Sequence, residues 1–173
     1  MITVTCLSAC AVKHEQPLDT QQAFFNNIQS LCGKVFSGYS TFPDDTSHDF
    51  FGHLLVADFK SCQQDEVKIQ FDVGENRSRT WIITDTDQGL LLKHDHRHED
   101  GTPDDITNYG GWANDQGTAW QQHFEADEET AELIPDAATN VWMLDYDPNT
   151  QILTYDLKRH NQPRYQAQLR PVK

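Results

Sequence analysis

The sequence predicts an all-β domain: an antiparallel up-and-down barrel of about nine to ten strands, preceded by one helix. Segments in which apolar and polar residues alternate recur along most of the chain, as in strands that bury one face. Turn residues separate neighbouring segments, so consecutive strands pair as hairpins in a barrel or a sandwich. Long helical segments do not alternate with the strands, which disfavours a parallel α/β sheet.

The length and composition fit one acidic, folded domain. The chain has 173 residues, 27 acidic and 13 basic, for a net charge of −14. A nucleic-acid partner is disfavoured, because phosphate contacts need clustered Lys and Arg. Nine Phe, five Tyr and four Trp supply a substantial core. A run of about 18 apolar residues, as a membrane-spanning helix requires, does not occur.

The first residues resemble a bacterial lipobox, in the run Leu7-Ser8-Ala9-Cys10. This resemblance implies a lipid anchor on Cys10, a polar tether after it, and Ala11 suits retention in the outer membrane. Only nine residues precede Cys10 and none is basic, so a full signal peptide would begin upstream. The alternative is a short tail with a chance match. We assign residues 1–18 to signal and tether and residues 19–173 to the barrel.

The cysteines predict one disulfide. Cys6 would leave with the signal and Cys10 would carry lipid, which leaves Cys32 and Cys62 as an even pair in an oxidising envelope. Closing a loop of about 30 residues would contribute roughly 3 kcal/mol in the chain-entropy model. The alternative is two buried free thiols in a cytosolic protein.

The helix is predicted over residues 19–32. Asp19 suits the N-cap position, and Gly33 suits the position after the last turn. Apolar residues recur between them at helical spacing, at Phe24, Ile28 and Leu31.

The strands follow in chain order, most of them separated by turns such as Gly74-Glu75-Asn76 and Pro148-Asn149. The cleanest alternation lies in Glu66–Val73, where every second residue is apolar. A short acidic helix at Asp127–Leu133 ends before Pro135. The predicted strands cover 34–39, 52–60, 66–73, 79–85, 90–98, 106–109, 118–124, 141–146, 152–158 and 164–169.

The fifth of these strands carries three histidines on one face. Residues at alternate positions of a strand point to opposite faces. The even positions hold Leu90, Leu92, His94, His96 and His98, and the odd positions hold mostly charged residues. The histidines therefore continue the apolar face and should line the interior or mouth of the barrel.

Two such imidazoles can bind one transition metal, since same-face neighbours lie roughly 6.5–7 Å apart along a strand. His94 and His96 would then bind zinc, another transition metal or haem, and His98 is one candidate third ligand. Three alternatives remain open: histidines that hydrogen-bond and stabilise the rim, ligand contact without metal, and general acid–base catalysis. The other candidate third ligands are His123, His53, Asp58 and Tyr109.

Two further features could belong to a pocket. Gly110-Gly111-Trp112 is predicted as a turn with an aromatic lid, where Trp112 either packs or lines a pocket. Arg77 and Arg79 share a strand face, and they either hold an anion or form a solvated pair. The candidate ligand-binding residues are His94, His96, Tyr109 and Trp112.

Two resemblances bear on these predictions. A helix leading into Gly33-Lys-Val-Phe36 resembles the entry of calycin (lipocalin-like) barrels, where a Gly-x-Trp turn follows a helix that plugs one end; Phe36 sits one place later than that Trp. The segments Arg77–Thr84, Gly89–Gly101 and Tyr109–Gly111 resemble a group of uncharacterised bacterial secreted proteins and lipoproteins. That group implies an envelope location and supports the Cys32–Cys62 pair, and it has no established activity.

We therefore expect an envelope-tethered barrel, held to the outer membrane by its lipid and facing the periplasm or surface. The expected role is non-enzymatic: binding of a small molecule, or a structural role, with no catalytic residue assigned. The alternative is a metal- or haem-binding protein, possibly an enzyme, that uses His94, His96 and His98.

Overall fold

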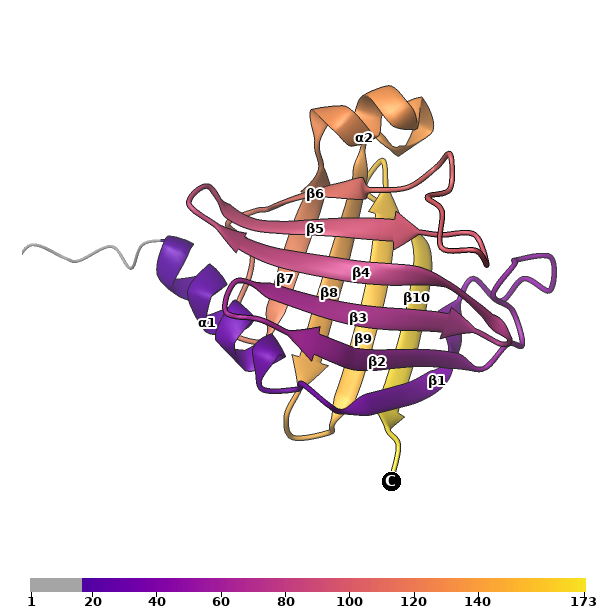
Figure 1. Cartoon of the computed structure of the whole chain (residues 1–173), viewed down its shortest axis with the longest axis horizontal. Helices are drawn as coiled ribbons and strands as arrows, with labels where there is room; N and C mark the ends of the chain where they lie inside the picture. The colour runs from indigo at the N-terminus through magenta and orange to yellow at the C-terminus, as the bar shows by residue number, and fades with distance from the viewer. Residues whose placement is uncertain (1–16) are drawn as a thin grey trace, which may run out of the picture.

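The computed structural model describes residues 17–173, which form a closed barrel of ten antiparallel strands behind one helix (Figure 1). The predictions for Cys6 and Cys10 lie outside the described residues. No helix within 17–173 combines the length and apolar character needed to cross a membrane. The strands are β1 (Val35–Phe42), β2 (Leu55–Cys62), β3 (Glu66–Val73), β4 (Asn76–Thr86), β5 (Gly89–His96), β6 (Tyr109–Ala113), β7 (Gln121–Ala126), β8 (Asn140–Asp147), β9 (Ile152–Arg159) and β10 (Gln162–Pro171).

The barrel closes because each strand pairs with its neighbours in sequence and β1 also pairs with β10. Closure leaves no exposed strand edge along the sheet. It confirms the predicted up-and-down barrel and rules out the sandwich. Short helical segments, α2 (Glu128–Leu133) and η1 (Pro135–Ala137), lie between β7 and β8.

Helix α1 (Pro17–Gln29) covers one end of the barrel (left in Figure 1). Phe24, Phe25 and Ile28 are fully buried and belong to the barrel core. The helix is also fixed by polar contacts: Leu90 N donates to Gln21 Oε1 at 3.0 Å, and Asn27 Nδ2 donates to Ala119 O at 2.7 Å. This end is therefore closed by packing as well as by hydrogen bonds.

The helix begins at Pro17 and ends at Gln29, earlier than the predicted 19–32. The chain after Gln29 tightens into a turn in which Leu31 N donates to Ile28 O and Cys32 N donates to Gln29 O. Gly33 follows with φ of +77°, the left-handed conformation that glycine adopts at low cost.

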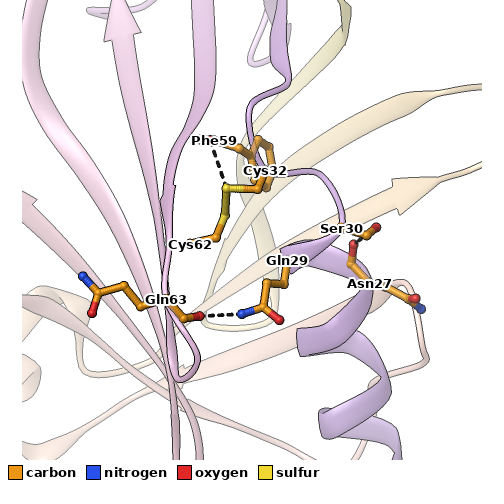
Figure 2. Close-up of a disulfide and its surroundings, with 7 residues drawn as sticks. All are labelled: Asn27, Gln29, Ser30, Cys32, Phe59, Cys62 and Gln63. Carbon is orange, nitrogen blue, oxygen red and sulfur yellow. Dashed lines mark hydrogen bonds between the residues drawn. A yellow bond between two sulfur atoms is a disulfide. The ribbon is translucent and has the colours of Figure 1, made fainter.

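A disulfide joins Cys32, in the turn after α1, to Cys62 at the end of β2 (Figure 2). Their Cα atoms lie 6.1 Å apart, within the usual range for a bridge. Nearby, Gln29 Nε2 donates to Gln63 O. The predicted pairing is confirmed, and it holds the helix against the β2–β3 end of the barrel.

The middle of the barrel is filled by aromatic side chains. The Trp81 ring stacks between Phe71 and Tyr155, with centroids 4.4 Å away on each side. Nearer α1, Phe36 makes edge contacts with Phe59 and Tyr146. Packed apolar side chains therefore fill the interior between α1 and the Trp81 layer.

The strands differ from the predictions mainly around β6, which covers Tyr109–Ala113 instead of 106–109. Gly110 and Gly111 lie within this strand and do not form the predicted turn. A Cβ at Gly110 would collide with Leu92 O, and one at Gly111 with Glu125 O. The glycines are therefore needed for close approach to both neighbouring strands.

Candidate functional site

A cavity of about 380 Å³ lies at the end of the barrel opposite α1. Residues from the β1–β2, β5–β6 and β7–β8 connections line it, together with residues of β9 and β10 near their hairpin. In Figure 1 this end is at the upper right, between the β1–β2 loop on the right and α2 at the top. The cavity is thus placed where ligands enter many barrels of this kind.

The cavity wall is mainly apolar and rich in aromatic rings. Trp142 and Tyr155 come from inward positions of β8 and β9, and Tyr155 is also part of the core stack. The five aromatic lining residues are Phe50, Tyr109, Trp142, Tyr155 and Tyr165. Aliphatic side chains complete the wall: Ile106, Ile134, Ala137 and Leu157.

His94 is buried behind this wall, with 4% of its surface exposed. Its Nδ1 lies 3.1 Å from Tyr109 O and its Nε2 lies 2.8 Å from the Tyr155 hydroxyl. A carbonyl oxygen only accepts, so Nδ1 carries the proton and donates, while Nε2 accepts from Tyr155. Burial lowers the pKa of His94 to about 3, and the ring is neutral at ordinary pH.

His96 faces the cavity itself. Its Nε2 lies 3.1 Å from the Tyr109 hydroxyl, and both residues line the cavity. Burial, and then the nearby Arg79 charge, lower the pKa of His96. Burial raises the pKa of Tyr109 to about 12, with Arg79 opposing the rise. The structure thus brings three predicted ligand residues together: His94, His96 and Tyr109.

His98 lies apart from the other two histidines, because β5 ends at His96 and His98 is exposed in the following loop. Within residues 17–173, no three His, Cys, Asp or Glu side chains are grouped so as to hold a metal ion. The Nε2 lone pair of His94 is also engaged by Tyr155. Metal or haem binding through His94, His96 and His98 stays a prediction that this arrangement does not favour.

Trp112 lies outside the barrel, on the face of β6 opposite to Gly111 and next to Lys93 and Glu129. Lys93 Nζ binds the carboxylates of Asp127 and Glu129 there, at 2.6 and 3.0 Å. The predicted aromatic lid is therefore not part of the cavity.

Sequence reasoning missed most charged residues of the cavity. Asp49, Asp104, Arg159 and Arg164 line it, and all but Arg159 belong to loops or a strand irregularity where alternation gives no guide. Arg159 lies at the end of β9, and its Nε donates to Asn140 Oδ1 at 2.9 Å.

Arg77 and Arg79 are predicted on one strand face, and the structure separates them. Arg79 is opposite His96 in the β4–β5 register and shares the inward face with Trp81, whereas the Arg77 side chain is 78% exposed. The Arg79 Cζ lies 5.1 Å from the centre of the Phe50 ring. Arg77 has the same parity relative to Trp81, so alternation alone does not tell which of the two arginines points inward.

The β1–β2 loop folds over part of the opening. The His48 ring stacks on Tyr165 at 5.2 Å, and Phe50 meets the same ring edge-on at 5.4 Å. Phe50 also lines a second hollow, which contains Arg79.

Comparison with known proteins adds nothing to this geometry: the chain matches no protein-family model, no curated protein and no solved structure.

Proposed function

We propose that the protein binds a small, largely apolar molecule in this cavity and does not transform it chemically. The observation that carries the proposal is an aromatic-lined cavity of about 380 Å³ at one end of a barrel whose other end is closed by α1. Ligand sites in proteins commonly measure about 300–1,000 Å³ and combine apolar walls with a few polar groups. His96 and Tyr109 would supply polar contacts that orient the ligand.

The pKa values and hydrogen bonds of the tyrosines and histidines in this site support ligand binding rather than acid–base catalysis. A general acid or base works best with a pKa near the operating pH. His94 has a pKa of about 3 and Tyr109 one of about 12, both far from neutrality. The Nε2 of His96 is held by the Tyr109 hydroxyl. These groups are suited to fix a wall rather than to transfer protons.

A fluorescence titration with N-phenyl-1-naphthylamine, a neutral apolar probe, tests the proposal. We expect saturable binding with one site per chain. Ala137 is buried and lines the cavity, so Ala137→Trp should fill it and weaken binding at least about 10-fold. Ala138, the adjacent residue, is exposed, and Ala138→Trp is the matched control.

Absence of probe binding to the native protein would refute the proposal and leave the structural role. Equal binding by the Ala137→Trp and Ala138→Trp variants, with near-UV spectra showing both folded, would place the probe elsewhere and refute it as well.

We also propose that the barrel works in the bacterial envelope, anchored by lipid on Cys10. The Cys32–Cys62 disulfide supports an oxidising compartment, since such bonds are rare in the cytosol. Trapping thiols in intact cells and measuring the mass of the Cys10 peptide test this. Free Cys32 and Cys62 together with an unmodified Cys10 would contradict it.

A further inference from the structure

Three arginines lie in or beside the cavity of this strongly acidic protein. The chain carries a net charge of −14 with only 13 basic residues. Two arginines, Arg159 and Arg164, nevertheless line this cavity. A third, Arg79, lies behind Phe50 at its edge. Packing of the core does not explain why arginines cluster here in a protein with a large negative net charge.

The guanidinium of Arg79 is incompletely satisfied. Its Nη1 is buried and has no hydrogen-bond partner among residues 17–173. The guanidinium packs on the face of Phe50, a cation–π contact. A buried donor without an acceptor is costly, and more so when it is charged. A ligand that supplied an acceptor would remove this cost.

The carboxylates of the cavity do not neutralise these arginines. Asp49 and Asp104 are the acidic residues that line it. In the described part of the chain, neither lies within 4.0 Å of a guanidinium nitrogen of Arg79, Arg159 or Arg164 as an ion pair. Arg159 and Arg164 therefore face Asp49 and Asp104 across the cavity without direct pairing, and Arg79 adds a third positive charge on the far side of Phe50.

We propose that the ligand of this cavity is an amphipathic organic anion, with its apolar body against Trp142, Tyr155 and Tyr165 and its acid group toward Arg79, Arg159 and Arg164. This inference rests on the proposed function, because it names the class of molecule that the same cavity takes. A carboxylate or sulfonate suits guanidinium groups, which form strong, directional bonds to such planar or multi-oxygen acceptors.

The field of Arg79 reaches the wall that the ligand would touch. The Arg79 charge opposes protonation of His96 and favours ionisation of Tyr109, although burial has the larger effect on both pKa values. An unpaired charge acts strongly in a low-dielectric interior. The ring of Phe50 lies over the guanidinium, so direct contact with Nη1 requires that ring to move aside.

Two probes with the same aromatic body separate the anion from the apolar part. These are 8-anilinonaphthalene-1-sulfonate, an anion, and neutral N-phenyl-1-naphthylamine. Both are titrated by fluorescence into the native protein and into Arg79→Met. We expect the variant to bind the sulfonate about 10-fold more weakly, as for one lost charge-assisted contact. Its affinity for the neutral probe should stay within about 2-fold.

The control is Arg77→Met, which removes the same charge two residues away, where the side chain is exposed. We expect less than a 2-fold effect on either probe, since an exposed charge is screened. Arg164→Gln is a second test that does not depend on the folding of the Arg79 variant, because Arg164 is exposed at the cavity edge. It should weaken sulfonate binding several-fold and leave neutral binding unchanged.

The outcomes are distinct. Binding of the neutral probe, with sulfonate affinity unchanged in both Arg79→Met and Arg164→Gln, overturns the anion and leaves the proposed function standing. An equal loss of sulfonate binding in Arg77→Met also overturns it, because the effect would then be general surface charge. Failure of both probes to bind native protein overturns the proposed function together with this inference.

Discussion

Acid should destabilise this protein through His94. The ring is buried, with Nδ1 donating to Tyr109 O and Nε2 accepting from Tyr155. A second proton on Nε2 would face the Tyr155 hydroxyl donor and place a charge in the core. The folded pKa is about 3, against 6.5 for an ordinary histidine. The unfolded chain therefore takes up this proton first, and acid favours unfolding.

The contribution of neutral His94 to the free energy of unfolding is complete above pH 6.5, and it is lost as the pH falls from 6.5 toward 3. Each pKa unit corresponds to about 1.4 kcal/mol, so lowering the pH from 7.5 to 5 should cost about 2 kcal/mol. That is a large part of the roughly 5–15 kcal/mol by which folded domains are stable. Burial also lowers the pKa values of His96 and His123, and these add to the total loss.

The contribution of His94 to the free energy of unfolding is isolated by urea unfolding of native protein and of His94→Gln at pH 7.5 and pH 5. Glutamine can donate to Tyr109 O and accept from Tyr155, and it does not titrate. The variant should lose about 2 kcal/mol less than native protein over this interval. His98→Gln, at an exposed histidine beyond the end of β5, is the control and should lose as much as native protein. Equal losses in native protein and His94→Gln would refute the reasoning.

Three further predictions concern the crosslink, the sheet and the cavity edge. Reducing Cys32–Cys62 should lower the free energy of unfolding by about 3 kcal/mol, measured by urea unfolding with and without reductant, and an unchanged midpoint would contradict this. Gly111→Ala should cost about 2 kcal/mol or more, because its Cβ collides with a β7 backbone oxygen; a melting temperature equal to that of native protein would count against it. Phe50→Ala uncovers Arg79 and should tighten sulfonate-probe binding, whereas weaker binding would show that Phe50 helps to hold the ligand.

The fold was predictable because barrel strands alternate between a buried and an exposed face. The strand predicted at Glu66–Val73 has the same bounds as β3, as the alternation of its residues indicates. The parity of β5 likewise placed His94 and His96 inward. The prediction failed at β6. Paired glycines usually indicate a turn in a sequence, but here they lie within the strand and permit close contact with the neighbouring strands.

The candidate site was predicted only in part. His94, His96 and Tyr109 were candidates in the sequence, and the structure brings them into contact; Trp112 lies outside the barrel, where the predicted strand bounds differ from those of β6. The charged residues of the opening come from segments far apart in the chain, such as Asp49 and Arg164. Their meeting depends on which strands close the barrel, and no local pattern records that.

By itself the sequence determined the all-β class, the helix before the first strand, the cysteine pair and the inward histidines. Each of these depends on local spacing or on composition, which neighbouring residues carry directly. Only the tertiary structure decided that β1 pairs with β10, that one end is plugged while the other is hollow, and that Tyr155 satisfies His94. These are relations between distant residues, and they are fixed by closure of the whole barrel.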